Sequence, residues 1–153
     1  MFKASILSPT SAVDAPVGSF LLANGQWHIC VDLGGKMVLT LTGGNEARLQ
    51  TAAGDPITYL TPSLTPAFEV EIPNLHECFN EPQKKPFGAA LNFTKMGLML
   101  MGMEMDERME NAKEYFFTLQ GAYFPSAKGV KVPVWGWSPL VTTADGTATF
   151  YLF

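Results

Sequence analysis

Two tight-turn signals that lie close together constrain the fold of this chain more than any other feature. The stretch SFLLANGQWHICVDLGGKMVLTLTGG places Asn24-Gly25 and Gly34-Gly35 between apolar runs. Two-residue Asn-Gly and Gly-Gly links supply the positive φ angles that a tight hairpin requires. The pattern therefore predicts three consecutive antiparallel strands, at about Ser19–Ala23, Gln26–Leu33 and Lys36–Thr42.

The middle strand of this meander alternates with period two, so its side chains divide between two faces of a sheet. One face holds Trp27, Ile29, Val31 and Leu33, and the other holds His28, Cys30 and Asp32. Three later stretches also read as strands: AFEVEI, GVKVPVW and TATFYLF. Pro133 predicts that its strand lies at a sheet edge or a bulge, because proline cannot donate to a strand ladder. NEARLQTAAG reads as a single helical turn.

One amphipathic helix is predicted near residues 106–120. Asp106 is a suitable N-cap, and Gly121 can end the helix. Between them, four apolar residues recur at helical spacing: Met109, Ala112, Phe116 and Leu119. One helix beside many short strands indicates a mainly β fold, a β-sandwich or barrel-like structure with one packed helix, in which residues 1–153 form a single domain.

Charge and hydropathy exclude several classes of function. The 153 residues include ten Lys and Arg against 14 Asp and Glu, a net charge of −4. Nucleic-acid binding needs a basic footprint, which this chain lacks. No stretch is long and apolar enough to span a membrane as a helix, and MFKASILSPTSAV lacks the apolar centre of a signal peptide. We therefore expect a protein made in the cytoplasm, with no nucleic-acid partner and no membrane span.

Low charge favours a surface that other subunits cover. Charged residues make up 16% of the chain, against roughly 25% in ordinary soluble domains. Both ends of the chain are apolar, and Phe150 and Phe153 in the closing TFYLF are predicted to pack in a sheet or against a neighbour. The expected partners are copies of the same chain or other structural proteins.

The stretch MGLMLMGMEM places methionine at every second position from Met99 onward. Read as a strand, it lines one face with Met99, Met101, Met103 and Met105. A helix here would hold Gly97 and Gly102 in its interior, each of which costs about 1 kcal/mol relative to Ala. Thioethers can bind Cu(I), but methionine more often fills irregular gaps in a core or an adaptable interface. We interpret this face as core or subunit interface.

Trp135 and Trp137, in VWGWSP, fall on the same face of a strand. Tryptophan rings of this kind stack on sugars in carbohydrate-binding sandwiches, and they also anchor cores and interfaces. Both interpretations remain open at this stage.

The two histidines, His28 and His76, each stand two residues before one of the two cysteines, Cys30 and Cys78. On a strand, His-x-Cys places both side chains on one face, so two such pairs could complete a tetrahedral Cys₂His₂ zinc site. The alternative is a buried cysteine beside a hydrogen-bonded histidine, twice. These four residues are the candidate metal ligands, and no cofactor is assigned.

No catalytic signature is present. A Cys–His nucleophile would also need an orienting group and an oxyanion hole, and neither cysteine stands in a recognisable nucleophile motif. DLGGK lies in a hairpin turn rather than at the start of a helix, so it does not predict a phosphate loop. An enzyme is therefore not expected.

Together these patterns predict a non-enzymatic structural or interaction protein. In general character it would be a β-rich subunit of a larger assembly, such as a phage tail, a capsid or a similar particle, and would be incorporated into the virion. The alternatives are a monomeric β-sandwich that binds a carbohydrate or another ligand, and a zinc-binding protein.

Overall fold

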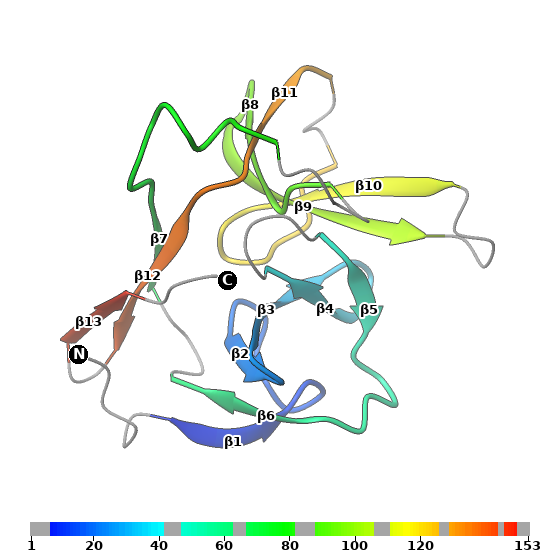
Figure 1. Ribbon diagram of the computed structural model, residues 1–153. Helices are drawn as coiled ribbons and strands as arrows, with labels where there is room; N and C mark the ends of the chain where they lie inside the picture. Colours follow the sequence, from blue (N-terminus) through cyan, green and yellow to red (C-terminus); the bar gives the residue numbers. More distant parts are fainter. Residues whose placement is uncertain are drawn as a thin grey trace.

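The structure, a computed structural model, describes residues 7–41, 47–62, 67–81, 88–105, 111–125, 129–143 and 146–149. These residues form three sheets in which every pairing between strands is antiparallel. Figure 1 shows the six-stranded sheet at the centre and bottom of the view, the four-stranded sheet above it and the three-stranded sheet to the left. The mainly β prediction is confirmed, and the arrangement is consistent with a β-sandwich.

The six-stranded sheet has the order β1 (Ser8–Ser11), β6 (Thr58–Thr61), β2 (Phe20–Ala23), β3 (Gln26–Asp32), β4 (Lys36–Thr40) and β5 (Leu49–Thr51). The four-stranded sheet has the order β10 (Ala112–Phe117), β9 (Gly97–Met105), β8 (Leu91–Thr94) and β11 (Lys131–Val134). The three-stranded sheet has the order β13 (Gly146–Thr149), β12 (Ser138–Thr143) and β7 (Ala67–Glu71).

The predicted Asn24-Gly25 hairpin turn is confirmed, and the chain also reverses at the second predicted position, although there Asp32 pairs with Lys36 and the link has three residues rather than the two predicted. Asn24 and Gly25 have φ angles of 53° and 71°, the doubly positive pair that a two-residue hairpin link needs, and they join β2 to β3. Gly34, with a φ of 69°, lies in the link between β3 and β4. Pro133 lies in β11, at the edge of the four-stranded sheet, as its missing N–H predicts.

The predicted helix near residues 106–120 is wrong. No helix occurs in the part of the chain that the structure describes, and residues 112–117 form β10, paired with β9 along its whole length. The run Tyr115-Phe116-Phe117 explains the error, because aromatic side chains lose rotamer freedom in a helix and pack well on a pleated sheet. The described segments likewise contain no helix that could cross a membrane.

Strand β3 separates two apolar cores. Its residues Trp27, Ile29 and Val31 face a large core that the four-stranded sheet closes from the other side with Leu91, Leu100 and Phe117. Its other face meets a small core, in which Cys30, Leu21 and Val38 lie under Ala12, Ala15, Ala52 and Tyr59. The face assignment made for this strand from its alternation is therefore confirmed for these residues.

Gly102 in β9 lets the two large sheets approach closely. A Cβ atom built at this position would lie 2.5 Å from Leu49 Cγ, so the side chain of Leu49 rests directly on the β9 backbone. A bridge between Arg48 and Met103 joins the sheets at the same place.

Replacing Gly102 by Ala should destabilise the fold by roughly 1–3 kcal/mol, because Leu49 would have to shift within a filled core. Gly35→Ala is the control, since its Cβ would meet nothing within 4 Å. Urea denaturation of both variants, and of Gly102→Ala combined with Leu49→Ala, measures the effect. The double variant should lose less stability than the two single losses added together. Full stability in Gly102→Ala would contradict this packing.

Candidate functional site

A row of polar side chains crosses the six-stranded sheet on the face that carries the small core. The register pairs His28 with Thr40, and the Thr40 N–H donates to the Arg48 carbonyl at 3.0 Å, so the three residues are neighbours on adjacent strands. Gln26 precedes His28 by two residues in β3, and Gln50 follows Arg48 by two at β5, so both share this face. We call Gln26, His28, Thr40, Arg48 and Gln50 the polar platform.

The five residues of the polar platform line a pocket of about 320 Å³, which we call the pocket over His28. Its lining is Ala23, Asn24, Gln26, His28, Thr40, Arg48, Gln50, Ile57 and Tyr59. His28, Thr40 and Tyr59 are buried and form the floor, whereas Asn24, Arg48, Gln50 and Ile57 are exposed and form the rim. The pocket is therefore polar at the floor as well as at the rim, unlike a gap between apolar core residues.

Each floor residue is held by a defined contact. His28 Nδ1 and Thr40 Oγ1 are hydrogen-bonded at 3.1 Å, and the His28 ring meets the Tyr59 ring edge-on, with centroids 5.6 Å apart. The Tyr59 hydroxyl donates to Asp55 Oδ2 at 2.6 Å, and the Ile57 N–H donates to Asp55 Oδ1 at 3.0 Å. Asp55 thus holds the Tyr59 side chain and the Ile57 backbone in place, although it does not itself line the pocket.

At the rim, Arg48 and Gln50 support one another. With the Gln50 amide oxygen turned toward the guanidinium, that oxygen accepts from Arg48 Nε at 3.2 Å and from Nη2 at 3.3 Å. The contact restricts the long arginine side chain and orients its planar group.

Burial sets the protonation of this face. Desolvation lowers the pKa of His28 to about 4, although the negative charge of Asp55 opposes the shift, so the ring is neutral at neutral pH. Desolvation also raises the pKa of Cys30 to about 11, against the opposing effect of Lys36. The pKa of Tyr59 is raised above its usual range by desolvation and by its hydrogen bond to Asp55. The Cys30 thiol, which contacts the Ala12 carbonyl, is therefore not an activated nucleophile.

The four candidate metal ligands are not brought together. Cys30 lies in the small core and Cys78 in the large one, on opposite faces of the six-stranded sheet. His76 is exposed in the turn that precedes Cys78. Within the described ranges, no three His, Cys, Asp or Glu side chains are placed to hold a metal ion. The hypothesis of a zinc site made by His28, Cys30, His76 and Cys78 is wrong, because the sheet itself separates the two pairs.

The methionine stretch forms β9, as its alternation predicts. Met99 and Met101 are buried in the large core, and Met103 packs against that core while partly exposed. Methionine therefore fills the core here, at least at the first two positions. Met105 ends the strand and its side chain lies outside the described part, as do Phe150 and Phe153.

Trp135 and Trp137 lie where the chain passes from β11 to β12. Both side chains are buried, so neither presents an open ring face to a sugar. The Cys78 carbonyl accepts hydrogen bonds from the N–H groups of Trp135, at 2.6 Å, and Gly136, at 3.4 Å. These bonds hold the link between β11 and β12 against the segment that contains Cys78. An exposed stacking platform made by these two tryptophans is therefore not formed.

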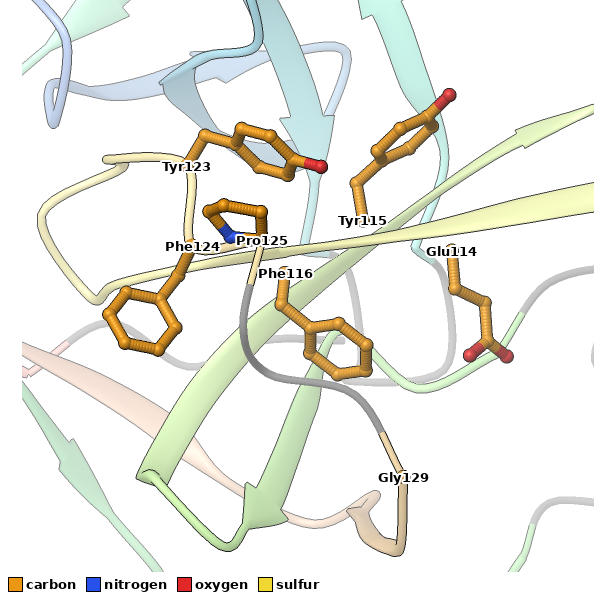
Figure 2. A pocket seen from close by; sticks show the side chains of 7 residues that line it. All are labelled: Glu114, Tyr115, Phe116, Tyr123, Phe124, Pro125 and Gly129. Atoms are coloured by element: carbon orange, nitrogen blue, oxygen red, sulfur yellow. The ribbon is translucent and has the colours of Figure 1, made fainter.

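A second pocket, of about 250 Å³, lies beside β10 and the segment 123–125. The rings of Tyr115 and Tyr123 lie on one side of β10, and those of Phe116 and Phe124 on the other (Figure 2). Lys131 forms an ion pair with Glu114, and its Nζ lies 5.9 Å from the centroid of the Phe116 ring. An aromatic pocket with one carboxylate would attract a cation. Here Lys131 of the same chain already provides that cation.

Apolar side chains also reach the surface at the β8–β11 end of the four-stranded sheet. Phe79, Phe93, Val130 and Val132 are exposed by 42%, 38%, 73% and 46%. Phe93 pairs with Val132 across β8 and β11, and the rings of Phe79 and Phe93 lie 6.4 Å apart. We call these four residues the β8–β11 patch.

Among the residues that line the pocket, sequence patterns single out only His28 as a candidate functional side chain. Arg48 and Gln50 lie in NEARLQTAAG, which predicts a helical turn, whereas its residues Leu49–Thr51 form β5. The alternation Arg48-Leu49-Gln50, polar then apolar then polar, is the signal that indicates a strand with two polar side chains on one face. No comparable pattern points to Thr40 or Tyr59, because the pairing of strands that are distant in the sequence places them beside the pocket.

No known protein family matches this chain, and no curated protein or solved structure is significantly similar to it.

Replacing His28 by Gln should change how stability depends on pH. The folded pKa of His28, about 4, lies below the ordinary value of 6.5, so between these values the unfolded chain binds a proton that the folded chain does not. The contribution of His28 to the free energy of unfolding is therefore fully present above pH 6.5. It is lost as the pH drops toward 4, by on the order of 3 kcal/mol.

Urea denaturation between pH 7 and pH 4 measures this slope. His28→Gln should lose less stability over the interval than the wild type, and His76→Gln, which changes an exposed histidine, should follow the wild type. Parallel curves for His28→Gln and the wild type would show that His28 is not buried as described.

Proposed function

We propose that this protein is a non-enzymatic interaction subunit that assembles with copies of itself. In general character it would be a β-rich component of a larger particle, such as a phage tail or capsid. The β8–β11 patch carries this proposal, because it is a group of large apolar side chains at the surface rather than one exposed residue.

The patch continues the apolar face of the large core out to the surface. Leu91 and Val134 share a face with Phe93 and Val132, two residues further along the same strands, and both are fully buried. The four-stranded sheet thus presents one apolar face whose inner part is covered within the chain and whose outer part is open. A second subunit would extend that cover over Phe93 and Val132.

Side chains, rather than strand addition, would make this contact. β11 is an edge strand and could in principle accept a further strand. Pro133 in its middle has no N–H to donate, which weakens any ladder on this edge. The free energy of association would therefore come from apolar surface that the contact removes from water, at roughly 25 cal/mol per Å².

A ligand-binding module is the second candidate, and the pocket over His28 favours it. Because Trp135 and Trp137 are buried, that pocket replaces them as the place where a small molecule would bind.

Val132→Lys should weaken self-association at least tenfold, because it places a charge in the middle of the apolar contact. Val13→Lys is the matched control: Val13 is 50% exposed, comparable with Val132, and it follows β1 at the opposite end of the molecule (Figure 1). The measurement is native mass by light scattering after gel filtration, over a range of concentration. The wild type and Val13→Lys should form the same oligomer. A wild type that stays monomeric throughout, or equal masses for both variants, would contradict the proposal.

A further inference from the structure

We propose that the pocket over His28 binds a neutral hydroxylated ring, of the class of monosaccharides and cyclic polyols. The proposal rests on the second candidate function, a ligand-binding module, and gives that module a ligand class. The site lies on the six-stranded sheet, away from the β8–β11 patch, so it does not depend on self-assembly.

The size of the pocket suits a single ring. A volume of about 320 Å³ lies at the lower end of the range of roughly 300–1,000 Å³ that ligand sites occupy. His28 and Thr40 pair across adjacent strands, about 4.8 Å apart, so neighbouring substituents of one ring can reach both side chains. Asn24 and Ile57 at the rim are exposed whereas the floor is buried, so a ligand would enter from the solvent side.

His28 presents an unpaired nitrogen to the pocket. Its side chain is only 8% exposed, and its Nδ1 is hydrogen-bonded to Thr40 Oγ1 at 3.1 Å. Among the described residues, no group bonds to its Nε2, and this atom is not sealed from solvent. Nε2 therefore opens on the pocket that His28 lines. A ligand that bonds to Nε2 would complete the hydrogen bonding of a largely buried ring, in which an unpaired polar atom is costly.

The pairing of His28 with Thr40 favours a hydroxyl as the group that meets Nε2. If Nδ1 carries the ring proton, it donates to Thr40 Oγ1 and Nε2 accepts; in the other tautomer the Thr40 hydroxyl donates to Nδ1 and Nε2 donates. A hydroxyl matches either tautomer, whereas a carboxylate can only accept and an ammonium group can only donate. The side-chain amides of Asn24 and Gln26, which also line the pocket, offer donors and acceptors to further hydroxyls.

The floor of the pocket disfavours a charged group. Its residues His28, Thr40 and Tyr59 are neutral at neutral pH, because desolvation lowers the pKa of His28 to about 4 and raises the pKa of Tyr59. A charged group brought to this floor would lose its water without meeting an opposite charge there, which costs far more than burying a hydroxyl. Arg48 lies at the rim and has contacts of its own, so the choice of a neutral ligand rests on the floor alone.

Apolar groups complete the site. Ala23, Ile57 and Tyr59 line the pocket beside the polar side chains. Tyr59 is fixed by its hydrogen bond to Asp55 and by its edge-on contact with the His28 ring. The C–H groups of a sugar or cyclitol ring would pack on these surfaces while its hydroxyls meet the polar residues. A few placed polar groups on an otherwise apolar wall are typical of sites for small molecules.

The test is a titration of the full-length protein, followed by the imidazole nitrogen resonances of His28 and the backbone amide resonances of the polar platform. The probes are glucose, galactose and mannose, each beside its uronate and its 2-amino-2-deoxy form, and myo-inositol beside cyclohexanol. At least one sugar or myo-inositol should shift these resonances in a saturable way. Its charged or hydroxyl-poor counterparts should bind at least tenfold more weakly.

Variants separate binding at this site from binding elsewhere. His28→Phe keeps a ring beside Tyr59 but removes both nitrogens, so it should lose at least tenfold in affinity for the probe that binds. His76→Phe makes the same change at an exposed histidine outside the pocket and should leave the affinity unchanged. Thr40→Val removes the hydroxyl that orients His28 and should lose at least threefold, which keeps the test decisive if His28→Phe does not fold. Thermal unfolding of each variant checks the fold.

Three outcomes would overturn the proposal: no sugar or cyclitol of the set shifts the His28 resonances, a uronate or amino sugar binds more tightly than its parent sugar, or the pocket variants bind as well as His76→Phe. The second outcome would leave a ligand-binding module standing and overturn only the neutral ligand. Self-association, measured by light scattering, is independent of all three, so the failure of this site and the failure of the assembly proposal are distinguishable.

Discussion

The burial of strand β3 on both faces is the constraint on which the rest of the structure depends. Ile29, Cys30 and Val31 follow one another along the strand, and none has any exposed surface. A strand in this position needs an apolar layer on each side, and the chain provides two unequal ones. The four-stranded sheet covers one face with large side chains. Ala12 and Ala15, which follow β1, pack on the other face together with Ala52, which follows β5, and Tyr59 of β6.

The inequality of these two layers produces the pocket over His28. Large side chains fill the space between the six-stranded and four-stranded sheets, and Gly102 lets the sheets meet at Leu49. On the other face, alanine residues and Tyr59 cover Cys30 and Val38 but leave His28 and Thr40 under a hollow. His28 is thus desolvated but accessible from a polar pocket, a combination typical of binding sites rather than of cores.

How much of this could be predicted from the sequence depends on the range of the interactions. The Asn24-Gly25 turn, the reversal near Gly34, the faces of β3, the β9 strand and the edge position of Pro133 follow from local chemistry. The length of the turn at Gly34, three residues rather than the predicted two, depends on the register of β3 with β4. The prediction of a helix near 106–120 was wrong because residues 112–117 pair with β9 along their whole length. No local sequence pattern reveals that pairing. His28 was identified, but as a partner of Cys78. The sheet that separates them, and the approach of Arg48 and Tyr59, depend on tertiary pairing.

Hydrogen exchange of the backbone amides under native conditions tests the two-sided burial of β3 most directly. If β3 is covered on both faces, the amides of Ile29, Cys30 and Val31 should be among the slowest in the protein and exchange only by global unfolding. The amides of the edge strands β1 and β11 should exchange faster, through local opening. If the β3 amides exchanged as fast as those of β1, one face of the strand would be open. The small core, and with it the floor of the pocket over His28, would then not exist as described.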